Sequence, residues 1–403
     1  MSTSKSKALT FARAFSVLVI ARTASAVVNL VHDCDEAFNF WEPLHYLVHG
    51  HGLQTWEHSP EFALRSYLYL GLHWLVAKPI AMVAGDARGK RVTFVGVRVA
   101  LGLASAASEA WLCREVARLD AFAGAMLTAL LAWSAGMFAA STAFLPSSFA
   151  MYCITAAAAA ALAGRHRTSC AACVVAVVWG WPFAGIAAIP PGLDALGHLG
   201  FRRTLLAILA PLVITAGMSV AVDSYFYGRV TSSTLNILRY NVAGGGSELY
   251  GVEGVTFYFR NLFNAFTLGL PLALAAPLLA LASAALRSSG AAGAVARDAR
   301  AGSGFGRLMI AYSPFPLTLA FFSSVAHKEE RFMYVVYPLL CMGAAVALAA
   351  GVDVAAKLRQ TLRLRGLTVV AALGAAGGDS ALVERCSGAQ TSGVRGGGVR
   401  GER

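Results

Sequence analysis

The sequence predicts an all-α multi-pass membrane protein with about ten transmembrane segments and polar loops between them. Hydrophobic residues make up 57% of the 403 residues and charged residues only 13%, whereas soluble domains carry about 25% charged residues. The mean hydropathy is +0.61. Many apolar runs approach the length of about 20 residues that a helix needs to cross a bilayer. These observations place the chain among multi-pass membrane proteins.

The first apolar run, FARAFSVLVIARTASAVVNLV at 11–31, follows the basic start MSTSKSKALTFAR. Because basic residues flank the cytosolic ends of membrane helices, this start predicts a cytosolic N-terminus and a signal anchor. The polar and aromatic stretch 32–62 would then emerge on the non-cytosolic side as a first luminal loop.

Nine further apolar runs follow and are expected to form the remaining helices. They cover residues 63–84, 92–112, 120–140, 147–164, 169–190, 204–222, 257–286, 308–326 and 333–352. The basic loops GDARGKR and GRHRTS, at 85–91 and 164–169, are both typical of cytosolic loops. Three of the runs lie between them, and loops on one side need an even number of crossings. One run within 92–164 is therefore expected to be re-entrant or wrongly assigned.

Two later regions are polar. Residues 223–256 form a second expected luminal loop, with GGG at 244–246 as a flexible turn. Residues 353–403 are basic and then rich in Gly, Ala and Ser, a composition typical of a disordered or aberrant tail. The membrane domain is therefore expected to cover residues 1–352.

The net charge of +12 suits cytosolic flanks that face anionic lipid. It does not indicate nucleic-acid binding, because no basic stripe with interleaved aromatic residues stands outside the apolar background. The seven cysteines are odd in number and scattered, so they imply no disulfide framework. Cys170 and Cys173 form a CxxC without a second pair, and are read as small residues of a membrane helix.

Two charged clusters carry the candidate chemistry, because charges near membrane depth are costly and mark function. HDCDEAFNFWEPLHYL (32–47) brings acidic residues directly after the first run, and HKEER (327–331) lies between two late runs. Arg and Lys can hold a phosphate, and a nearby carboxylate can take a proton from an attacking hydroxyl. The pair of clusters suits group transfer from an anionic donor.

The residues alone also allow simpler interpretations of the two clusters. The acidic residues and HKEER could be solvated loops with paired surface charges. His45, His49 and His51 lie close together and could be a metal site. Asp33 and Asp35 form a DxD, which holds a metal in many sugar-nucleotide transferases, but so short a pattern also arises by chance.

Several long motifs identify a family. The stretch DCDEAFNFWEPLHYLVHGHGLQTWEHSPEFALRSYLYL is followed in order by STAFLPSSFAMY, GWPFAGIAAIP, DSYFYGRV and HKEERFMYVVYPLLC. Over about residues 10–350 the chain resembles the dolichyl-phosphate-mannose-dependent α-1,2-mannosyltransferases of N-glycan precursor assembly, in glycosyltransferase family 22. The resemblance implies a GT-C fold in the endoplasmic reticulum membrane with a luminal active site.

The resemblance also implies an activity. Mannose would pass from dolichyl-phosphate-mannose to the lipid-linked oligosaccharide in α-1,2 linkage, with inversion and with neither a metal nor another cofactor. The alternative with the same donor is a mannosyltransferase of GPI-anchor synthesis. The alternative of another class is a transporter or a non-catalytic membrane subunit, although the matching halves typical of transporters are not found.

Carried over by position, Asp35 is the expected general base and Glu36 the second candidate. Glu329 and Glu330 would orient the cations beside them. The expected donor-phosphate ligands are His327, Lys328, Arg331 and Arg65. The residues expected on the acceptor side are Trp41, Glu42, His45 and Tyr250.

The sequence departs from the family pattern in two places. LYGVEGVTFYF at 249–259 lacks the proline and tryptophan that the family carries there, in a loop expected to contact the acceptor. The family also continues beyond the HKEERF region with further crossings, whereas this chain drifts into the tail 353–403. We expect this tail to come from a truncated or mis-spliced gene model, which sequencing of the transcript would test.

Overall fold

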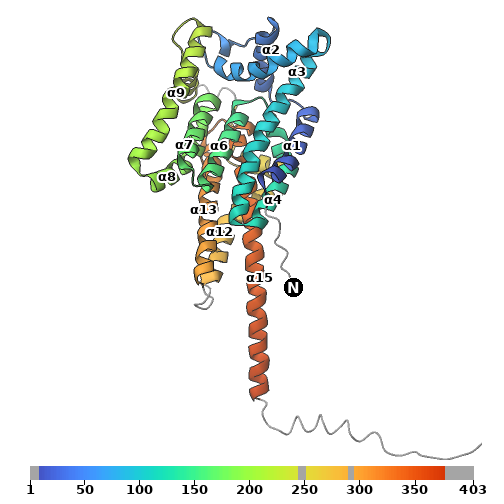
Figure 1. Cartoon of the computed structure of the whole chain (residues 1–403), viewed down its shortest axis with the longest axis vertical. Coiled ribbons are helices and arrows are strands. Elements are labelled where there is room, and N and C mark those ends of the chain that lie inside the picture. The colour runs from blue at the N-terminus through green and yellow to red at the C-terminus, as the bar shows by residue number, and fades with distance from the viewer. Residues whose placement is uncertain (1–8, 244–250, 289–294, 377–403) are drawn as a thin grey trace, which may run out of the picture. The chain divides into compact units, whose positions relative to one another are not determined.

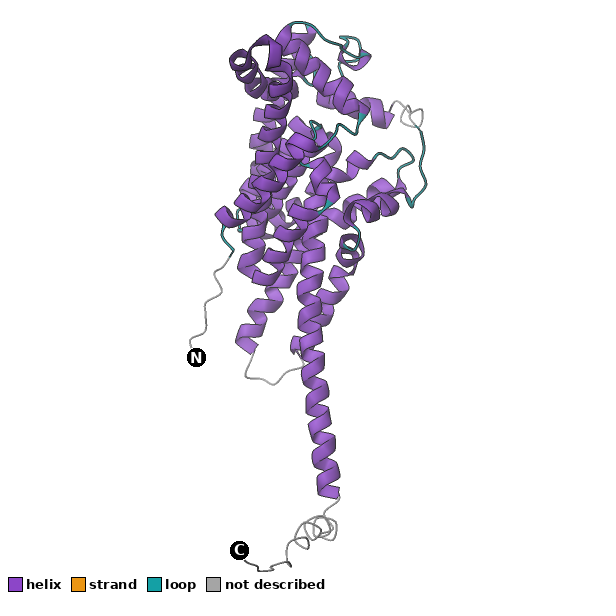
Figure 2. Ribbon diagram, turned by 90° about the vertical axis from the view of Figure 1, so that its right-hand side faces the viewer, coloured by secondary structure: helices purple, strands orange, loops and turns teal. Residues whose placement is uncertain are grey.

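The computed structural model describes residues 9–243, 251–288 and 295–376, and every regular element within them is a helix (Figures 1 and 2). The chain divides into two units, Met1–Gly351 and Val352–Arg403. The second unit is described only where α15 (Tyr337–Ala376) continues past Gly351. The helices confirm the predicted all-α, multi-pass class.

Seven helical segments are long and apolar enough to cross a membrane. They are Phe11–Val28, Tyr67–Gly85, Gly89–Leu119, Phe201–Tyr227, Gly269–Leu286, Gly304–Ser324 and Glu330–Gln360. Two shorter apolar helices, α4 (Ala121–Trp133) and α6 (Pro146–Leu162), match two more of the expected runs. The remaining expected run, 169–190, is broken into several short helices.

That broken run has a local cause in its sequence. Helix α7 (His166–Val175) widens into the π-helical turn η3 (Ala176–Gly180), and Trp181 then adopts an extended backbone. The short 3-10 turn η4 (Pro182–Ala184) leads into α8 (Gly185–Leu199). Because Pro182 has no N–H, the chain restarts a helix there and does not continue the previous one. Helices α7 and α8 therefore form a hairpin whose turn carries the GWPF motif.

The other helices follow the expected runs with small shifts. Helix α1 (Phe11–Val28) starts at Thr10, whose hydroxyl accepts the amide of Arg13 at 3.3 Å, as an N-cap does. Short helices α5 (Ala135–Ala140) and α10 (Ser233–Ala243) lie between longer ones. The rest are α9 (Phe201–Tyr227), α11 (Phe257–Phe266), α12 (Gly269–Ser288), α13 (Val295–Tyr312), α14 (Pro314–Ser324) and the 3-10 segment η6 (Glu330–Val336).

Helix α3 (Tyr67–Leu119) is two arms joined at Gly85, which has a φ of 67° that favours glycine. The first arm runs along the segment after α1. Trp74 Nε1 donates to Leu47 O at 3.2 Å, and Lys78 Nζ donates to Val48 O at 2.8 Å. Beyond the kink, Lys90 Nζ lies 3.5 Å from His51 Nε2. The middle of the first arm therefore lies beside residues 47 and 48, and the start of the second arm lies beside His51.

These contacts correct the predicted side of one loop. Lys90 of the 85–91 loop lies beside His51 of the 32–62 segment, so the two loops share a face, and Tyr67–Gly85 does not cross between them although it is long and apolar enough. The cytosolic assignment of 85–91 is therefore incompatible with a luminal 32–62 loop. Loops on opposite faces are separated by an odd number of crossings. The three runs between 85–91 and 164–169 meet this condition, so no run within 92–164 has to be re-entrant.

The bundle around these loops is held by a buried ion pair. Arg22 Nη2 on α1 lies 2.7 Å from Glu109 Oε2 on α3, and both side chains are 1% exposed. The same nitrogen donates to Leu131 O on α4 at 2.8 Å. A buried charge is tolerated when its partner and hydrogen bonds are present, so this pair fixes α1 against α3 and α4.

Candidate active site

The candidate site is built on the segment between α1 and α3. The π-helical turn η1 (Glu36–Trp41) begins directly after Asp35 and leads into α2 (Glu42–His49). A π turn carries one residue more than an α turn and redirects the side chains at its start. Here Glu36 is buried, whereas the Asp35 side chain keeps 24% of its surface exposed.

Asp35 lies between two arginines from distant parts of the chain. Its Oδ2 is 2.6 Å from Nη1 of Arg331 and 3.1 Å from Nη2 of Arg65. Arg331 also contacts Asp33 Oδ1 at 3.1 Å, and Arg65 contacts Glu57 Oε2 at 2.7 Å. The predicted meeting of the acidic cluster with the HKEER cluster is therefore confirmed, although 298 residues separate Asp33 from Arg331.

The two arginines control the acidity of Asp35. Burial acts to raise the pKa of Asp35, but the charges of Arg331 and Arg65 and their hydrogen bonds outweigh it. The pKa of Asp35 is therefore held below its usual value of 3.8, and the group is an ionised but weak base in this arrangement. Among the described residues, its second oxygen Oδ1 has no hydrogen bond or ion pair.

Glu36 points the other way. Its Oε1 accepts the indole N–H of Trp41 and the main-chain N–H of Phe144, each at 3.0 Å. Burial raises the pKa of Glu36 above its usual value of 4.5, against these two hydrogen bonds. The Trp41 ring packs against Phe94 and Phe144, at centroid distances of 4.5 and 4.9 Å. Glu36 and Trp41 thus anchor the STAFLPSSF segment to η1.

Glu42 and His45 were expected on the acceptor side and lie in α2, where both contact the segment that follows this helix. Glu42 Oε2 accepts the amide of Leu53 at 3.1 Å, and His45 Nδ1 lies 2.8 Å from the His51 carbonyl oxygen. The rings of His45 and His49 are 4.6 Å apart. No contact among the described residues joins Glu42 or His45 to Asp35, so the structure does not bring them to the ion-paired cluster.

The HKEER cluster divides in two. Arg331 enters the Asp35 site, and Glu329 contacts both Arg331 and His327, which agrees with the expected orienting role of Glu329. Lys328 Nζ instead donates to the carbonyl oxygens of Glu253, at 2.7 Å, and of Val325. His327 Nδ1 lies 2.9 Å from the Gly251 carbonyl oxygen. His327 and Lys328 therefore hold the 251–253 loop, whereas Tyr250 lies outside the described residues.

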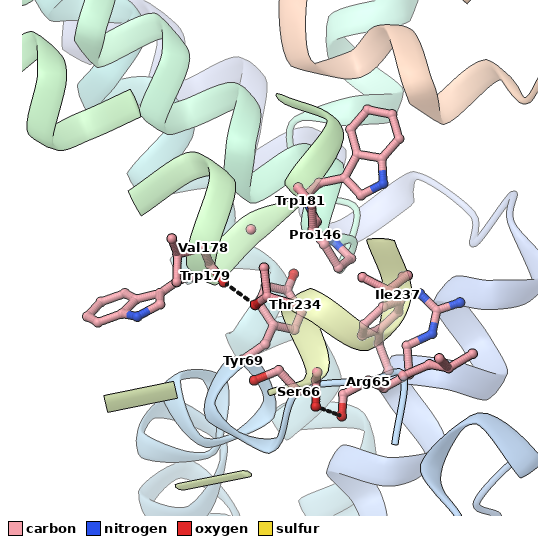
Figure 3. Close-up of a pocket in the computed structure, with 14 residues that line it drawn as sticks. Arg65, Ser66, Tyr69, Pro146, Val178, Trp179, Trp181, Thr234 and Ile237 are labelled. Atoms are coloured by element: carbon pink, nitrogen blue, oxygen red, sulfur yellow. Dashed lines mark hydrogen bonds between the residues drawn. The ribbon is translucent and has the colours of Figure 1, made fainter. Parts of the chain in front are cut away.

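A cavity of about 40 Å³ lies beside Arg65 and is shown in Figure 3. Trp179 and Trp181 of the GWPF turn region line it, as does Thr234 of α10, which donates to Val178 O at 3.1 Å. Trp181 stacks on Phe332, with centroids 5.1 Å apart, next to Arg331. The cavity has room for water, since a water molecule needs only about 10–15 Å³ of such volume.

Sequence reasoning missed two features of this site. Glu57 was given no role from the sequence, yet it holds Arg65 and also accepts from Asn39 at 2.9 Å. The GWPF residues were recognised as part of a family motif without a role, and the cavity-lining residues of α10 were not singled out. Their signal was present in the sequence as polar and aromatic residues that interrupt apolar runs, but no rule of spacing connects them to Arg65.

The chain is similar in sequence to known mannosyltransferases over most of its length. A family described as the Alg9-like mannosyltransferase family matches residues 13–376. The chain is 40% identical to the α-1,2-mannosyltransferase ALG9 of Arabidopsis thaliana, over 83% of this chain and 55% of that protein. It is 40% identical to alg9 of Schizosaccharomyces pombe, over 88% and 60%, and 35% identical to human ALG9, over 84% and 54%.

The chain spans a little over half the length of these relatives. A shorter match, 32% identical over 37% of this chain, is to GPI mannosyltransferase 3 of Trypanosoma brucei brucei. No solved structure gave a significant match. The family match covers most of the chain, including both charged clusters that meet at Asp35, and the chain therefore belongs to the Alg9-like mannosyltransferase family.

Proposed function

We propose that this chain transfers mannose from dolichyl-phosphate-mannose to the dolichyl-pyrophosphate-linked oligosaccharide, in α-1,2 linkage and with inversion. The site would face the lumen of the endoplasmic reticulum. The observation that carries the proposal is the placement of Asp35 between Arg331 and Arg65, at 2.6 and 3.1 Å. Such a cluster offers a carboxylate for a proton and two guanidinium groups for a phosphate.

The reaction follows from an exchange of partners at the arginines. The donor phosphate competes with Asp35 for Arg331 and Arg65, because phosphate and carboxylate are both anions that can accept two hydrogen bonds from one guanidinium group. When the phosphate takes the arginines, Asp35 loses the charges that lower its pKa. The carboxylate then becomes a stronger base at the moment when the donor is in place.

In the transfer step, an acceptor hydroxyl oxygen attacks the anomeric carbon of mannose on the face opposite the phosphate. The bond from that carbon to the phosphate oxygen breaks as the new glycosidic bond forms, which inverts the carbon. The hydroxyl proton passes to Asp35, and the arginines hold the charge that develops on the leaving phosphate.

The remaining predicted residues support the site from outside. Glu36 and Trp41 fix the η1 turn, and His327 and Lys328 fix the 251–253 loop, so we assign them positioning roles. Asp33, Cys34 and Asp35 could in principle hold a metal, because one ligand atom from each lies within 4.8 Å of the others. Arg331 already contacts both carboxylates, so a cation would have to displace a bound guanidinium. This favours transfer without a metal.

The lipid chain of the donor needs an apolar path, and one lies nearby. An open groove of about 600 Å³ runs between α11 and α12, lined by Phe259, Phe263 and Leu274 with Arg260 at one side. Helix α11 follows the loop that Lys328 holds through Glu253. We propose that the groove receives the first isoprene units of the donor.

The direct test is transfer by the purified full chain in lipid nanodiscs. Dolichyl-phosphate-mannose labelled in the sugar is supplied with defined lipid-linked oligosaccharides, and the product is digested with an α-1,2-specific mannosidase. We expect a labelled product that loses its label on digestion. Transfer to a synthetic GPI intermediate but not to the oligosaccharide would favour the GPI alternative, which the Trypanosoma match supports. Solute transport without mannose transfer would refute both.

A further inference from the structure

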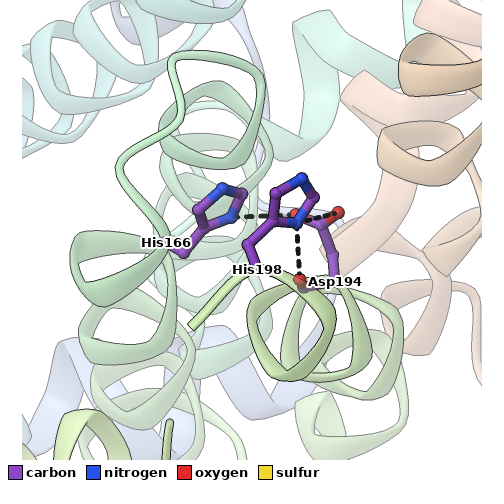
Figure 4. Close-up of side chains that lie close together, drawn as sticks. All are labelled: His166, Asp194 and His198. Atoms are coloured by element: carbon purple, nitrogen blue, oxygen red, sulfur yellow. Dashed lines mark hydrogen bonds and ion pairs between the residues drawn. The ribbon is translucent and has the colours of Figure 1, made fainter. Parts of the chain in front are cut away.

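A second cluster of metal-ligand side chains lies at the open end of the α7–α8 hairpin (Figure 4). His166 is the first residue of α7. Asp194 and His198 are one turn apart in α8 and therefore share a face of that helix. Figure 4 shows both imidazoles beside the one carboxylate.

The three side chains converge closely. Nδ1 of His166 lies 3.0 Å from Asp194 Oδ2, and Nδ1 of His198 lies 3.4 Å from Asp194 Oδ1. Nδ1 of His198 also lies 2.8 Å from the main-chain carbonyl oxygen of Asp194. The imidazole rings are stacked, with centroids 4.1 Å apart and planes at 15°. One ligand atom from each residue lies within 4.8 Å of the others.

Hydrogen bonding alone leaves part of this cluster unsatisfied. Nδ1 of His166 is buried from solvent and makes no hydrogen bond of acceptable geometry within the described residues, despite its short distance to Asp194. The Asp194 side chain is only 9% exposed, and its only ion-pair partners there are the two histidines.

We propose that His166, Asp194 and His198 bind one divalent transition-metal ion. Imidazole nitrogen and carboxylate oxygen are the ligands that zinc and its neighbours accept, at about 2.0–2.2 Å from the metal. The ion satisfies the buried nitrogen of His166 and the charge of Asp194 together. Coordination through Nδ1 of His198 uses the tautomer with the proton on Nε2, and the metal then replaces the contact of Nδ1 with the Asp194 carbonyl oxygen. His198 is 59% exposed, so water can complete the coordination on that side.

The site is separate from the proposed catalytic cluster. The helical stretch from His166 to Gly180 is about 20 Å long at a rise of about 1.5 Å per residue. That length separates the metal ligands from the GWPF turn, which lines the cavity at Arg65. The ion therefore clamps the open end of the hairpin and fixes the orientation of the turn. It takes no part in mannose transfer.

The test is zinc binding by the full chain, purified without a histidine tag and treated with a chelator. Isothermal titration with zinc chloride should give one site per chain, and cobalt chloride should give the visible absorption of Co²⁺ with nitrogen ligands. His166→Gln, Asp194→Asn and His198→Gln should each weaken binding more than about tenfold. Zinc should raise the thermal midpoint of the wild-type chain but not of His198→Gln, whose exposed position preserves the fold.

The matched control is the double variant His45→Gln/His49→Gln, which removes another histidine pair in the same chain. It should retain the site. Equal thermal midpoints of His198→Gln and the wild type in chelator show that the variant is folded. The proposal is overturned if the wild-type chain binds no zinc, if the three variants bind it as tightly as the wild type, or if the control variant loses it.

Discussion

Asp35→Asn tests the assignment of the general base most directly. The substitution keeps the size and shape of the side chain but removes its charge and its ability to take a proton. Loss of a positioned general base typically lowers a rate by about 10²–10⁴-fold. At about 1.36 kcal/mol per factor of ten, this corresponds to roughly 3–5 kcal/mol of activation free energy. We expect kcat to fall by this factor.

The structure predicts that the same variant stays folded. Arg331 retains Asp33 and Glu329, and Arg65 retains Glu57, so neither arginine is left without a carboxylate. The Asp35 side chain is 24% exposed, and ion pairs of such partly exposed groups contribute about 1 kcal/mol or less. The thermal midpoint in detergent should therefore change by only a few degrees.

Asp33→Asn is the matched control, because Asp33 lies two positions before Asp35 in the chain and contacts the same Arg331, at 3.1 Å. It removes one charge beside that arginine but leaves Asp35 in place. Initial rates of labelled mannose transfer at saturating donor and acceptor compare the two variants. If Asp35→Asn turns over at near the wild-type rate, or if both variants lose activity equally, Asp35 is not the base.

Three further predictions follow from the contacts. Arg331→Lys keeps the charge but not the fork that reaches two carboxylates, so kcat/KM should fall roughly 10–100-fold in the same transfer assay. Because burial raises the pKa of Glu36, the free energy of unfolding of the wild type should fall as pH rises from 4.5 through that raised pKa. Glu36→Gln should remove this pH dependence from the thermal midpoint, because the amide oxygen of glutamine still accepts the N–H groups of Trp41 and Phe144. Glu109→Gln leaves Arg22 buried without a counter-charge and should cost about 3–5 kcal/mol, seen as a lower thermal midpoint that Arg22→Met/Glu109→Leu restores.

Much of the fold was predictable because the formation of a membrane helix depends mainly on the residues of that segment. Backbone groups in a membrane must be satisfied within the segment, so length and hydropathy identify helices directly. Breaks inside apolar runs were not predictable in this way. The GWPF turn and the kink at Gly85 depend on backbone angles that hydropathy does not report.

The side of the 85–91 loop shows a second limit. The rule for basic residues counts charges and assigned this loop to the cytosol. Lys90 of this loop instead approaches the ring of His51, at 3.5 Å. A basic residue that is bound by neighbouring protein groups carries no information about the membrane side.

The sequence by itself determined the class of the protein, its family motifs and the two charged clusters that could carry group transfer. These follow from composition and from residues close together in the chain. Only the tertiary structure decided which members of each cluster meet. Asp35 and Glu36 are neighbours, yet the π turn directs one to Arg331 and Arg65 and the other into the core. Attraction between charges acts over a few ångströms, so pairing across hundreds of residues exists only after the helices pack.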